Sequence, residues 1–232
     1  MRPQQAHQSL KVLIGAKQPV MLHGSPGVGK SQIVKQLAEE LGFQLIDLRL
    51  SQLDPVDLRG VPSVTEGKTT WNVPSFFPTE GQGILFLDEI NSAAQATQAA
   101  AYQLVLDRKL GDYELPEGWT IIAAGNRTTD RAIVNQMSTA LKNRFTHLNF
   151  EVNTDDWCRW ALNSGISPIV LGFIRFRPTL LNEFEQKGNS KEEKQRMQQL
   201  KDAQAFATPR SWEFLSNVLE QQPDPEIEYE LY

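Results

Sequence analysis

A glycine-rich run near the start of the chain has the residue types and spacing of a phosphate-binding loop. The chain reads Gly24-Ser25-Pro26-Gly27-Val28-Gly29-Lys30-Ser31 there, which matches the pattern G-x-x-x-x-G-K-[ST] at every fixed position. Its glycines allow backbone conformations in which successive N–H groups point into one concavity, at the positive end of a following helix. In this pattern the lysine reaches the β- and γ-phosphates of a nucleotide, and the hydroxyl is a ligand of Mg²⁺. The run therefore predicts a nucleotide site that uses Lys30 and Ser31.

The flanks of this run supply the elements that such a loop needs. The residues before it, 19–22, are a short apolar stretch typical of a buried parallel strand. After it, residues 30–41 carry apolar side chains at helical spacing, and Gly42 stands where a helix C-cap glycine belongs. We therefore expect a strand, a glycine-rich turn and a helix.

Polar side chains follow two other apolar runs. Residues 83–87 lead into Asp88 and Glu89, and residues 119–124 lead into Gly125 and Asn126. Ligands of open α/β sheets bind at the carboxyl ends of strands, where Asp88 could hold Mg²⁺ and Glu89 could deprotonate a water molecule. A surface turn is the alternative for the acidic pair, and we favour the catalytic interpretation because a phosphate-binding loop precedes it. For Asn126, a turn and a functional role are equally common unless the sheet order brings the two strands together.

The composition is that of an ordinary globular protein. The 232 residues are 40% hydrophobic and 22% charged, with a net charge of −5, which argues against a surface that mainly coats nucleic acid. No apolar run approaches the roughly 20 residues that span a bilayer, and residues 1–5 lack the apolar core of a signal peptide, so a cytoplasmic location is the default expectation. Cys158 is the only cysteine, and the histidines are scattered, so we assign them no metal or catalytic role.

The pattern along the chain changes near Asn153. Before it, apolar runs at 19–22, 43–50, 83–87, 119–124 and 146–150 alternate with helical stretches, which predicts a parallel five-stranded α/β sheet flanked by helices. Residues 51–80 interrupt this pattern and contain a predicted hairpin, 61–65 and 68–72, around Glu66-Gly67. After Asn153 the pattern is helical, with starts at Asn153, at Ser167-Pro168, at a capping box of Ser190 and Glu193, and at Thr208-Pro209. The predicted domains are 1–152, α/β and nucleotide-binding, and 153–232, helical.

Taken together, these motifs resemble the AAA+ ATPases, and most closely their MoxR branch within the dynein-related group. The matching stretches are GSPGVGKS (24–31), DPVDLRGVP (54–62), ILFLDEIN (84–91), LPEGWTIIAAGN (115–126), LKNRF (141–145) and ATPRSWE (207–213). They occur in the family's order and cover about residues 15–215.

The resemblance implies a role for each matching residue. Residues 24–31 would be Walker A, Asp88 and Glu89 would be Walker B, and Asn126 would be sensor 1. Arg144 would be the arginine finger, which enters the neighbouring subunit's site and neutralises charge on the transferring phosphate. Arg210 would be sensor 2 on a helical lid, where a cation in the first turn of a helix is itself a small argument for a bound anion. The family forms rings, usually hexamers, that use ATP and Mg²⁺.

The family also suggests what the insertion and the partners do. MoxR-like proteins carry an extra hairpin that faces the central pore in the region matching 51–80, where Trp71, Phe76 and Phe77 are candidate exposed aromatics. For Phe76 and Phe77, covering the core is an equal alternative. A von Willebrand factor A-domain protein is an expected partner, because MoxR-like ATPases often work with one.

The sequence favours an ATPase that remodels or activates another protein, and it leaves two alternatives open. One is a DNA-associated AAA+ loader or regulator, for which Arg49, Arg59 and Lys68 supply too few cations to decide. The other is a nucleotide-switched scaffold without turnover, against which the combination of Glu89, Asn126 and Arg144 argues. No motif that reads the base distinguishes ATP from GTP.

Overall fold

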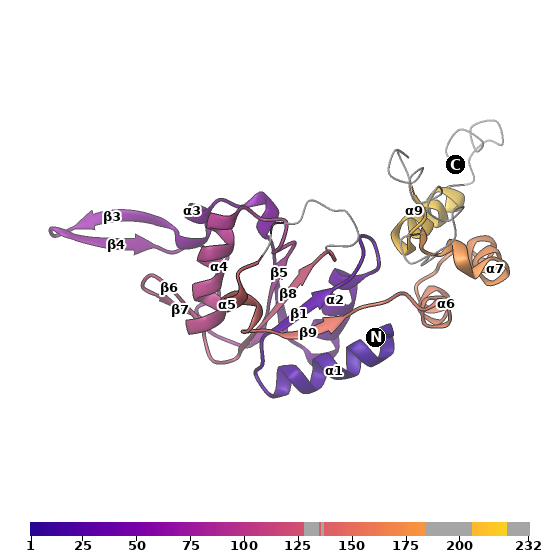
Figure 1. Cartoon of the computed structure of the whole chain (residues 1–232), viewed down its shortest axis with the longest axis horizontal. Coiled ribbons are helices and arrows are strands. Elements are labelled where there is room, and N and C mark those ends of the chain that lie inside the picture. Colours follow the sequence, from indigo (N-terminus) through magenta and orange to yellow (C-terminus); the bar gives the residue numbers. More distant parts are fainter. Residues whose placement is uncertain (128–134, 136, 184–205, 222–232) are drawn as a thin grey trace. The chain divides into compact units, whose positions relative to one another are not determined.

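Five apolar runs form one parallel sheet. In the computed structural model, which describes residues 1–127, 135, 137–183 and 206–221, these strands are β1 (Val20–His23), β2 (Gln44–Arg49), β5 (Gly83–Asp88), β8 (Trp119–Gly125) and β9 (Thr146–Asn149). Their order across the sheet is β2-β5-β8-β1-β9 (Figure 1), and all neighbouring strands are parallel. The predicted fold class is confirmed. Because β5 pairs with β8 and β8 pairs with β1, the carboxyl ends of these three strands are neighbours.

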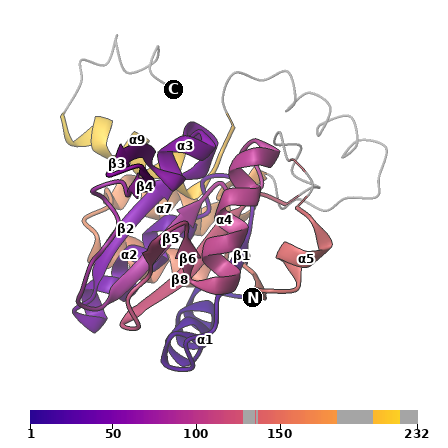
Figure 2. The ribbon, with the colours of Figure 1, turned by 90° about the vertical axis from the view of Figure 1, so that its left-hand side faces the viewer.

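Helices cover both faces of the sheet. Alternate residues of the strands, such as Met21, Leu85 and Ile121, pack in one core with the apolar side of α4 (Gln95–Asp107). The opposite face is covered by α2 (Lys30–Leu41), and Figures 1 and 2 show α4 and α2 on opposite sides of the sheet. Helix α2 ends at Leu41, and Gly42 follows with φ +64°, as expected for a C-cap glycine. Two further helices of this part are α1 (Pro3–Gly15) and α5 (Thr139–Lys142).

The insertion between β2 and β5 contains the predicted hairpin. After a 3-10 turn (Leu50–Gln52) and α3 (Pro55–Arg59), strands β3 (Val61–Thr65) and β4 (Lys68–Asn72) pair antiparallel with Thr65 opposite Lys68. Glu66 and Gly67 between them have φ of +53° and +75°, the signs that a two-residue hairpin turn requires. Every side chain of β4 is exposed, and Figure 1 shows the hairpin extending away from the sheet.

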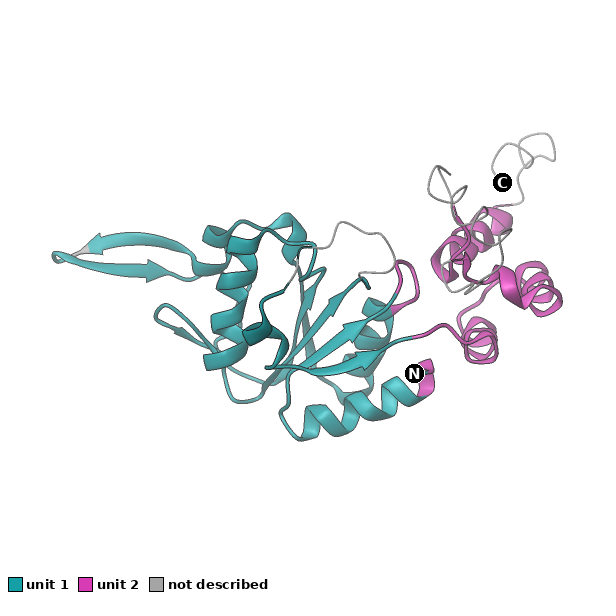
Figure 3. Cartoon of the chain, viewed as in Figure 1, with its two compact units in different colours: residues 1, 5–24, 30–150 teal, residues 2–4, 25–29, 151–232 magenta. Residues whose placement is uncertain are grey.

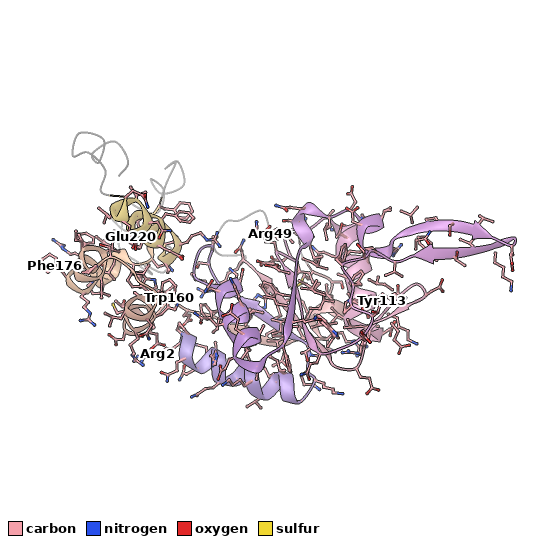
Figure 4. All side chains as sticks on the ribbon, turned by 180° about the vertical axis from the view of Figure 1, so that it is seen from behind. Arg2, Arg49, Tyr113, Trp160, Phe176 and Glu220 are labelled. Carbon is pink, nitrogen blue, oxygen red and sulfur yellow. The ribbon has the colours of Figure 1, made fainter. Side chains whose placement is uncertain are left out.

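The aromatic residues of the insertion divide between the surface and the core. Trp71 is 39% exposed on the hairpin, whereas Phe77 is only 5% exposed and belongs to the main core. The ring of Phe77 stacks on Tyr113 with centroids 4.9 Å apart, and Phe76 packs against the same core. Tyr113 (Figure 4) lies on the small hairpin of β6 (Lys109–Leu110) and β7 (Tyr113–Glu114). The suggestion that Phe77 is an exposed pore aromatic is therefore wrong, because the residues after β4 return to the core.

Two compact units make up the chain (Figure 3). Unit 1 comprises residues 1, 5–24 and 30–150 and contains the sheet; unit 2 comprises residues 2–4, 25–29 and 151–232. The two units are groups of residues that contact one another more than they contact the rest of the chain. The division into domains at 152/153 stays a prediction. None of the helices in the described ranges is long and apolar enough to cross a membrane.

Unit 2 is helical. Its helices are α6 (Thr154–Asn163), α7 (Pro168–Phe176) and α9 (Pro209–Glu220), and a 3-10 turn covers Pro178–Leu180. The helices begin at the residues that the sequence indicates, because the side chains of Asn153, Ser167 and Thr208 each accept a hydrogen bond from a backbone N–H of the first turn. Their core includes Trp157, Val170 and Ile174, and Trp160, Phe176 and Glu220 of this unit are labelled in Figure 4. The predicted capping box at Ser190 and Glu193 lies outside the described residues.

Candidate functional site

Lys30 and Asn126 meet at the carboxyl edge of the sheet in unit 1. Lys30 is the first residue of α2, and its Nζ donates to the carbonyl oxygen of Gly24 at 2.7 Å and to Oδ1 of Asn126 at 3.2 Å. Although it is a lysine, it is only 8% exposed, so its charge is stabilised by such oxygens rather than by bulk water. The condition for a functional Asn126 is met, because its strand β8 lies directly between β5 and β1.

Asp88 joins the end of β5 to the start of α2. Its Oδ2 accepts a hydrogen bond from Ser31 Oγ at 2.8 Å, and its Oδ1 accepts one from the backbone N–H of Glu89 at 2.8 Å. Asp88 is 8% exposed. A serine hydroxyl and a carboxylate side by side are the hard oxygen ligands that Mg²⁺ prefers, and Mg²⁺ takes few protein ligands when phosphates supply the others. The residues present therefore fit a phosphate-bound Mg²⁺.

Glu89 lies in a backbone conformation that is uncommon for a residue with a side chain. Its φ is +56°, and such left-handed residues are concentrated at functional sites. Its Oε2 accepts a hydrogen bond from the hydroxyl of Ser51, the second residue of the 3-10 turn that follows β2. Sequence analysis did not identify Ser51. The signal that could have found it is its position just past a strand that pairs with β5.

A second residue that sequence analysis missed is Asn91, which ties the end of β5 to the end of β8. Its Nδ2 donates to the carbonyl oxygen of Asn126 at 2.6 Å, and the backbone N–H of Ile90 donates to the carbonyl of Ala124 at 3.0 Å. The approach is so close that a Cβ on Gly125 would lie 2.4 Å from Oδ1 of Asn91. A side chain at 125 would displace Asn91, which positions the backbone that carries the Asn126 side chain.

Asp47 lies near Asp88 and Glu89 at this edge of the sheet, so three acidic side chains are close together. Burial is the main factor that raises the pKa of Asp47, and the neighbouring charge of Asp88 raises it further, while Arg49 at the end of β2 (Figure 4) opposes the shift. Among the described residues, no group of three or more His, Cys, Asp or Glu side chains could hold a metal ion.

Arg144 is exposed just after the end of α5. The residue's N–H donates to the carbonyl oxygen of Leu141 at 3.1 Å, but within the described ranges its guanidinium makes no hydrogen bond or ion pair. The structure therefore does not bring Arg144 to Lys30 and Asp88 through any such contact.

Within unit 2, residues of the glycine-rich loop contact the start of α9. The N–H of Arg210 donates to the carbonyl oxygen of Gly27 at 3.3 Å. Gly27 has φ +72°, and a Cβ on it would lie 2.8 Å from Oγ1 of Thr208. Glycine is required at 27 on both grounds, and the first turn of α9, with Arg210, adjoins the loop.

Two of the histidines, which the sequence shows far apart, lie together in unit 1. His23 Nε2 is 2.8 Å from Nδ1 of His147, and the rings stack with centroids 5.1 Å apart. Burial lowers the pKa of His23 to about 4, and the nearby His147 and Arg127 add to the effect. The two residues are 124 positions apart in the sequence, and they meet because β1 and β9 are neighbours in the sheet.

Some known proteins are similar to this chain in sequence, and some solved structures are similar to it in fold. It is 27% identical over 170 residues to midasin of Giardia intestinalis and 34% identical over 101 residues to midasin of Dictyostelium discoideum. These matches cover 68% and 40% of the chain but only 4% and 2% of the relatives, so the chain spans a small part of their length.

Solved structures of two mutants of RuvB from Thermotoga maritima show the likeness of fold. One of them matches with a TM-score of 0.57 at 17% identity, over 92% of this chain and 60% of that one. The other matches with a TM-score of 0.54 at 16% identity, over 94% of this chain and 70% of that one.

The part of the chain that contains the sheet matches a family model. The model describes the ATPase family associated with various cellular activities and matches residues 20–151, more than half of the chain. These residues include the five strands and the cluster of Lys30, Ser31, Asp88 and Asn126. The chain therefore belongs to the AAA family of ATPases.

Proposed function

We propose that the protein is a ring-forming enzyme that hydrolyses Mg-ATP to ADP and phosphate and uses the reaction to remodel or activate a partner protein. The observation that carries this proposal is the pair of hydrogen bonds at one edge of the sheet, Ser31 to Asp88 and Lys30 to Asn126. They bring together the residue types that a nucleotide, its metal and the attacking water require.

Binding of the triphosphate would use the loop and the start of α2. The ammonium group of Lys30, now bonded to the neutral oxygens of Gly24 and Asn126, would exchange them for β- and γ-phosphate oxygens, a stronger charge-assisted contact. The backbone N–H groups of residues 24–31, apart from Pro26, would bind the other phosphate oxygens. Ser31 and Asp88 would hold Mg²⁺, which supplies positive charge against the phosphates.

Glu89 is the group we assign to proton removal. Its carboxylate would take a proton from a water molecule as the water oxygen bonds to the γ-phosphorus and the bond to the ADP oxygen breaks. In the structure this carboxylate accepts a hydrogen bond from the hydroxyl of Ser51, which fixes the orientation of the Glu89 side chain. Asn126, with its backbone carbonyl bonded to Asn91, would orient the water or contact the γ-phosphate.

Arg144 supports the proposed ring. A guanidinium that is exposed and makes no ion pair within the described ranges suits an anion supplied by another copy of the chain. We propose that Arg144 completes the site of the neighbouring subunit, in a ring that is usually hexameric in this family. Arg210, in the first turn of α9, would contact the nucleotide phosphates.

The partner is the finer part of the proposal. The midasin relatives support a place in the MoxR-like group, in which a chaperone-like role and a von Willebrand factor A-domain partner are expected. The exposed hairpin with Trp71 is the surface we propose for contact with the remodelled protein.

A subunit-mixing experiment tests the central claim of a shared site. Arg144→Ala subunits keep a complete binding loop but lack the finger, and Lys30→Ala subunits keep the finger but lack the binding lysine. Each should be inactive alone, whereas the mixture should recover part of the phosphate release. Lys142→Ala, which removes an adjacent exposed cation, is the matched control and should not need rescue. If no ratio of the two proteins restores turnover, the shared site is refuted.

A further inference from the structure

A chain of hydrogen bonds runs from the end of α5 to the residue before the glycine-rich loop. His147 Nε2 is 2.7 Å from the carbonyl oxygen of Lys142, the last residue of α5, and His147 Nδ1 is 2.8 Å from His23 Nε2. All three residues belong to unit 1. The proposed function uses neither histidine.

The Lys142 carbonyl, at one end of this row of hydrogen bonds, determines which histidine nitrogens carry protons. A carbonyl oxygen can only accept, so Nε2 of His147 must donate to Lys142. In an uncharged ring Nδ1 then accepts, and Nε2 of His23 must donate to it. Two uncharged rings would therefore give one direction of donation, from His23 to His147 to the carbonyl of Lys142. The pKa of His23, lowered by burial to about 4, agrees with an uncharged ring at neutral pH.

Each end of this row of hydrogen bonds lies close in sequence to a residue of the proposed reaction. His23 directly precedes Gly24, whose carbonyl oxygen accepts the Lys30 ammonium. At the other end, the carbonyl of Lys142 also accepts the N–H of Phe145 at 3.3 Å, and Phe145 is buried. The backbone around Arg144 is thus enclosed in a turn whose first residue is held by His147.

We propose that His147 and His23 are positioning residues, which fix the turn carrying Arg144 relative to the strand that leads into the phosphate-binding loop. A subunit would then present its arginine to the neighbour in a position that depends on its own loop. This inference rests on the proposed function, because it assigns a use to Arg144 in the adjoining site.

A merely structural role for the histidines makes a different prediction. If they only stabilised unit 1, replacing them would impair a subunit both as the donor of the finger and as the owner of the active site. A positioning role for Arg144 impairs the subunit as donor alone. Mixed rings separate the two, because Lys30→Ala subunits act only as donors and Arg144→Ala subunits act only as owners of the site.

The experiment places His147→Phe on one side of the mixture at a time. Added to the Lys30→Ala donors, it should lower the rescued rate of phosphate release by about two- to tenfold, the range for the net loss of one neutral hydrogen bond, here the one that holds the Lys142 carbonyl. Added to the Arg144→Ala subunits, it should leave the rate unchanged. His147→Gln in the donors should restore part of the rate, because an amide N–H can still donate to the Lys142 carbonyl.

Controls make each outcome decisive. His7→Phe in the donors, which alters a partly exposed histidine paired with Glu40 on α2, should change nothing. An equal fall on both sides, or no fall in the donors, overturns the inference while the shared site stands. A failure of the unmodified mixture to recover turnover instead refutes the shared site itself, and this inference with it.

Discussion

The carboxyl edge of the sheet and the β3–β4 hairpin belong to the same unit but are built in opposite ways. At the edge, Lys30, Asp88 and Asn91 are buried. Lys30 and Asn91 are hydrogen-bonded to Asn126, and Asp88 is hydrogen-bonded to Ser31. On the hairpin every side chain of β4 is exposed, and Val64 of β3 is 76% exposed. Both segments were recognised from the sequence, but only one of them has its side chains fixed by the fold.

This difference separates two kinds of function. Buried polar groups that are hydrogen-bonded to fixed partners are held in one arrangement, which positioning of phosphates and water would require. A two-stranded hairpin with no buried face is marginally stable and gains little from its own side chains. Substitutions at the edge should therefore change chemistry and stability together, whereas substitutions on the hairpin should change contacts with other molecules alone.

The largest effect expected is on turnover at the edge. Glu89→Gln should lower the rate of ATP hydrolysis by about 100- to 10,000-fold, because an amide cannot take the proton of water, while ATP binding persists. The measurement is phosphate release beside equilibrium binding of a fluorescent ATP analogue. Glu114→Gln, an exposed glutamate on β7, is the control and should keep full turnover. Retained hydrolysis in Glu89→Gln would remove Glu89 from the mechanism.

The next largest effect is a difference in the free energy of unfolding between substitutions of a buried and an exposed apolar residue. Leu85→Ala on β5 should lower the free energy of unfolding by about 2–5 kcal/mol, because the Leu85 side chain is fully buried in the main core. Val64→Ala on the hairpin should change it by no more than about 0.5 kcal/mol. Urea unfolding of both variants measures this. A similar loss in the two would mean that the hairpin is packed in solution and that the two regions do not differ in this respect.

Two asparagines sharpen the same comparison at a smaller scale. Asn91 donates to the carbonyl of Asn126 at 2.6 Å in a buried setting, and Asn72 donates to the carbonyl of Val61 at 3.3 Å in an exposed one. Asn91→Ala should lower the free energy of unfolding by about 1–3 kcal/mol and reduce turnover, since it leaves the half-buried carbonyl of Asn126 without its donor. Asn72→Ala should be nearly neutral, because water replaces the lost donor. Equal values for the pair would show that burial is not the deciding factor.

The smallest effect concerns pH. Burial and nearby cations lower the pKa of His23 from 6.5 to about 4 in the folded protein. Between these two pH values the unfolded chain binds more protons than the folded one, so this contribution to stability is present above pH 6.5 and is lost as the pH falls toward about 4. His23→Gln should remove it, and urea unfolding of both proteins across this window should show their stabilities converging as the pH falls. A constant difference would contradict the lowered pKa.

Local signals explain most of what could be predicted. The turn between β1 and α2, helix α2 with Gly42 after it, and the Glu66-Gly67 turn are encoded by neighbouring residues, and each of these local structures was confirmed. The N-caps of unit 2 follow the same rule, because a cap side chain bonds to an N–H two or three residues away.

Other features depend on residues that are distant in the chain. The burial of Phe77 follows from where β6 and β7 bring Tyr113, and the bond from Ser51 to Glu89 follows from the pairing of β2 with β5. The histidine pair joins residues 124 positions apart. No local pattern distinguishes these residues from ordinary surface positions.

The sequence by itself predicted the type of chemistry, because it contains a lysine, a hydroxyl and two acids in patterns typical of phosphate and Mg²⁺ binding. Only the tertiary structure decided which side chains support them, because a hydrogen bond acts over about 3 Å and the order of the strands sets which ends come that close. The order β2-β5-β8-β1-β9 brings Asn126 to Lys30, Ser51 to Glu89 and His147 to His23.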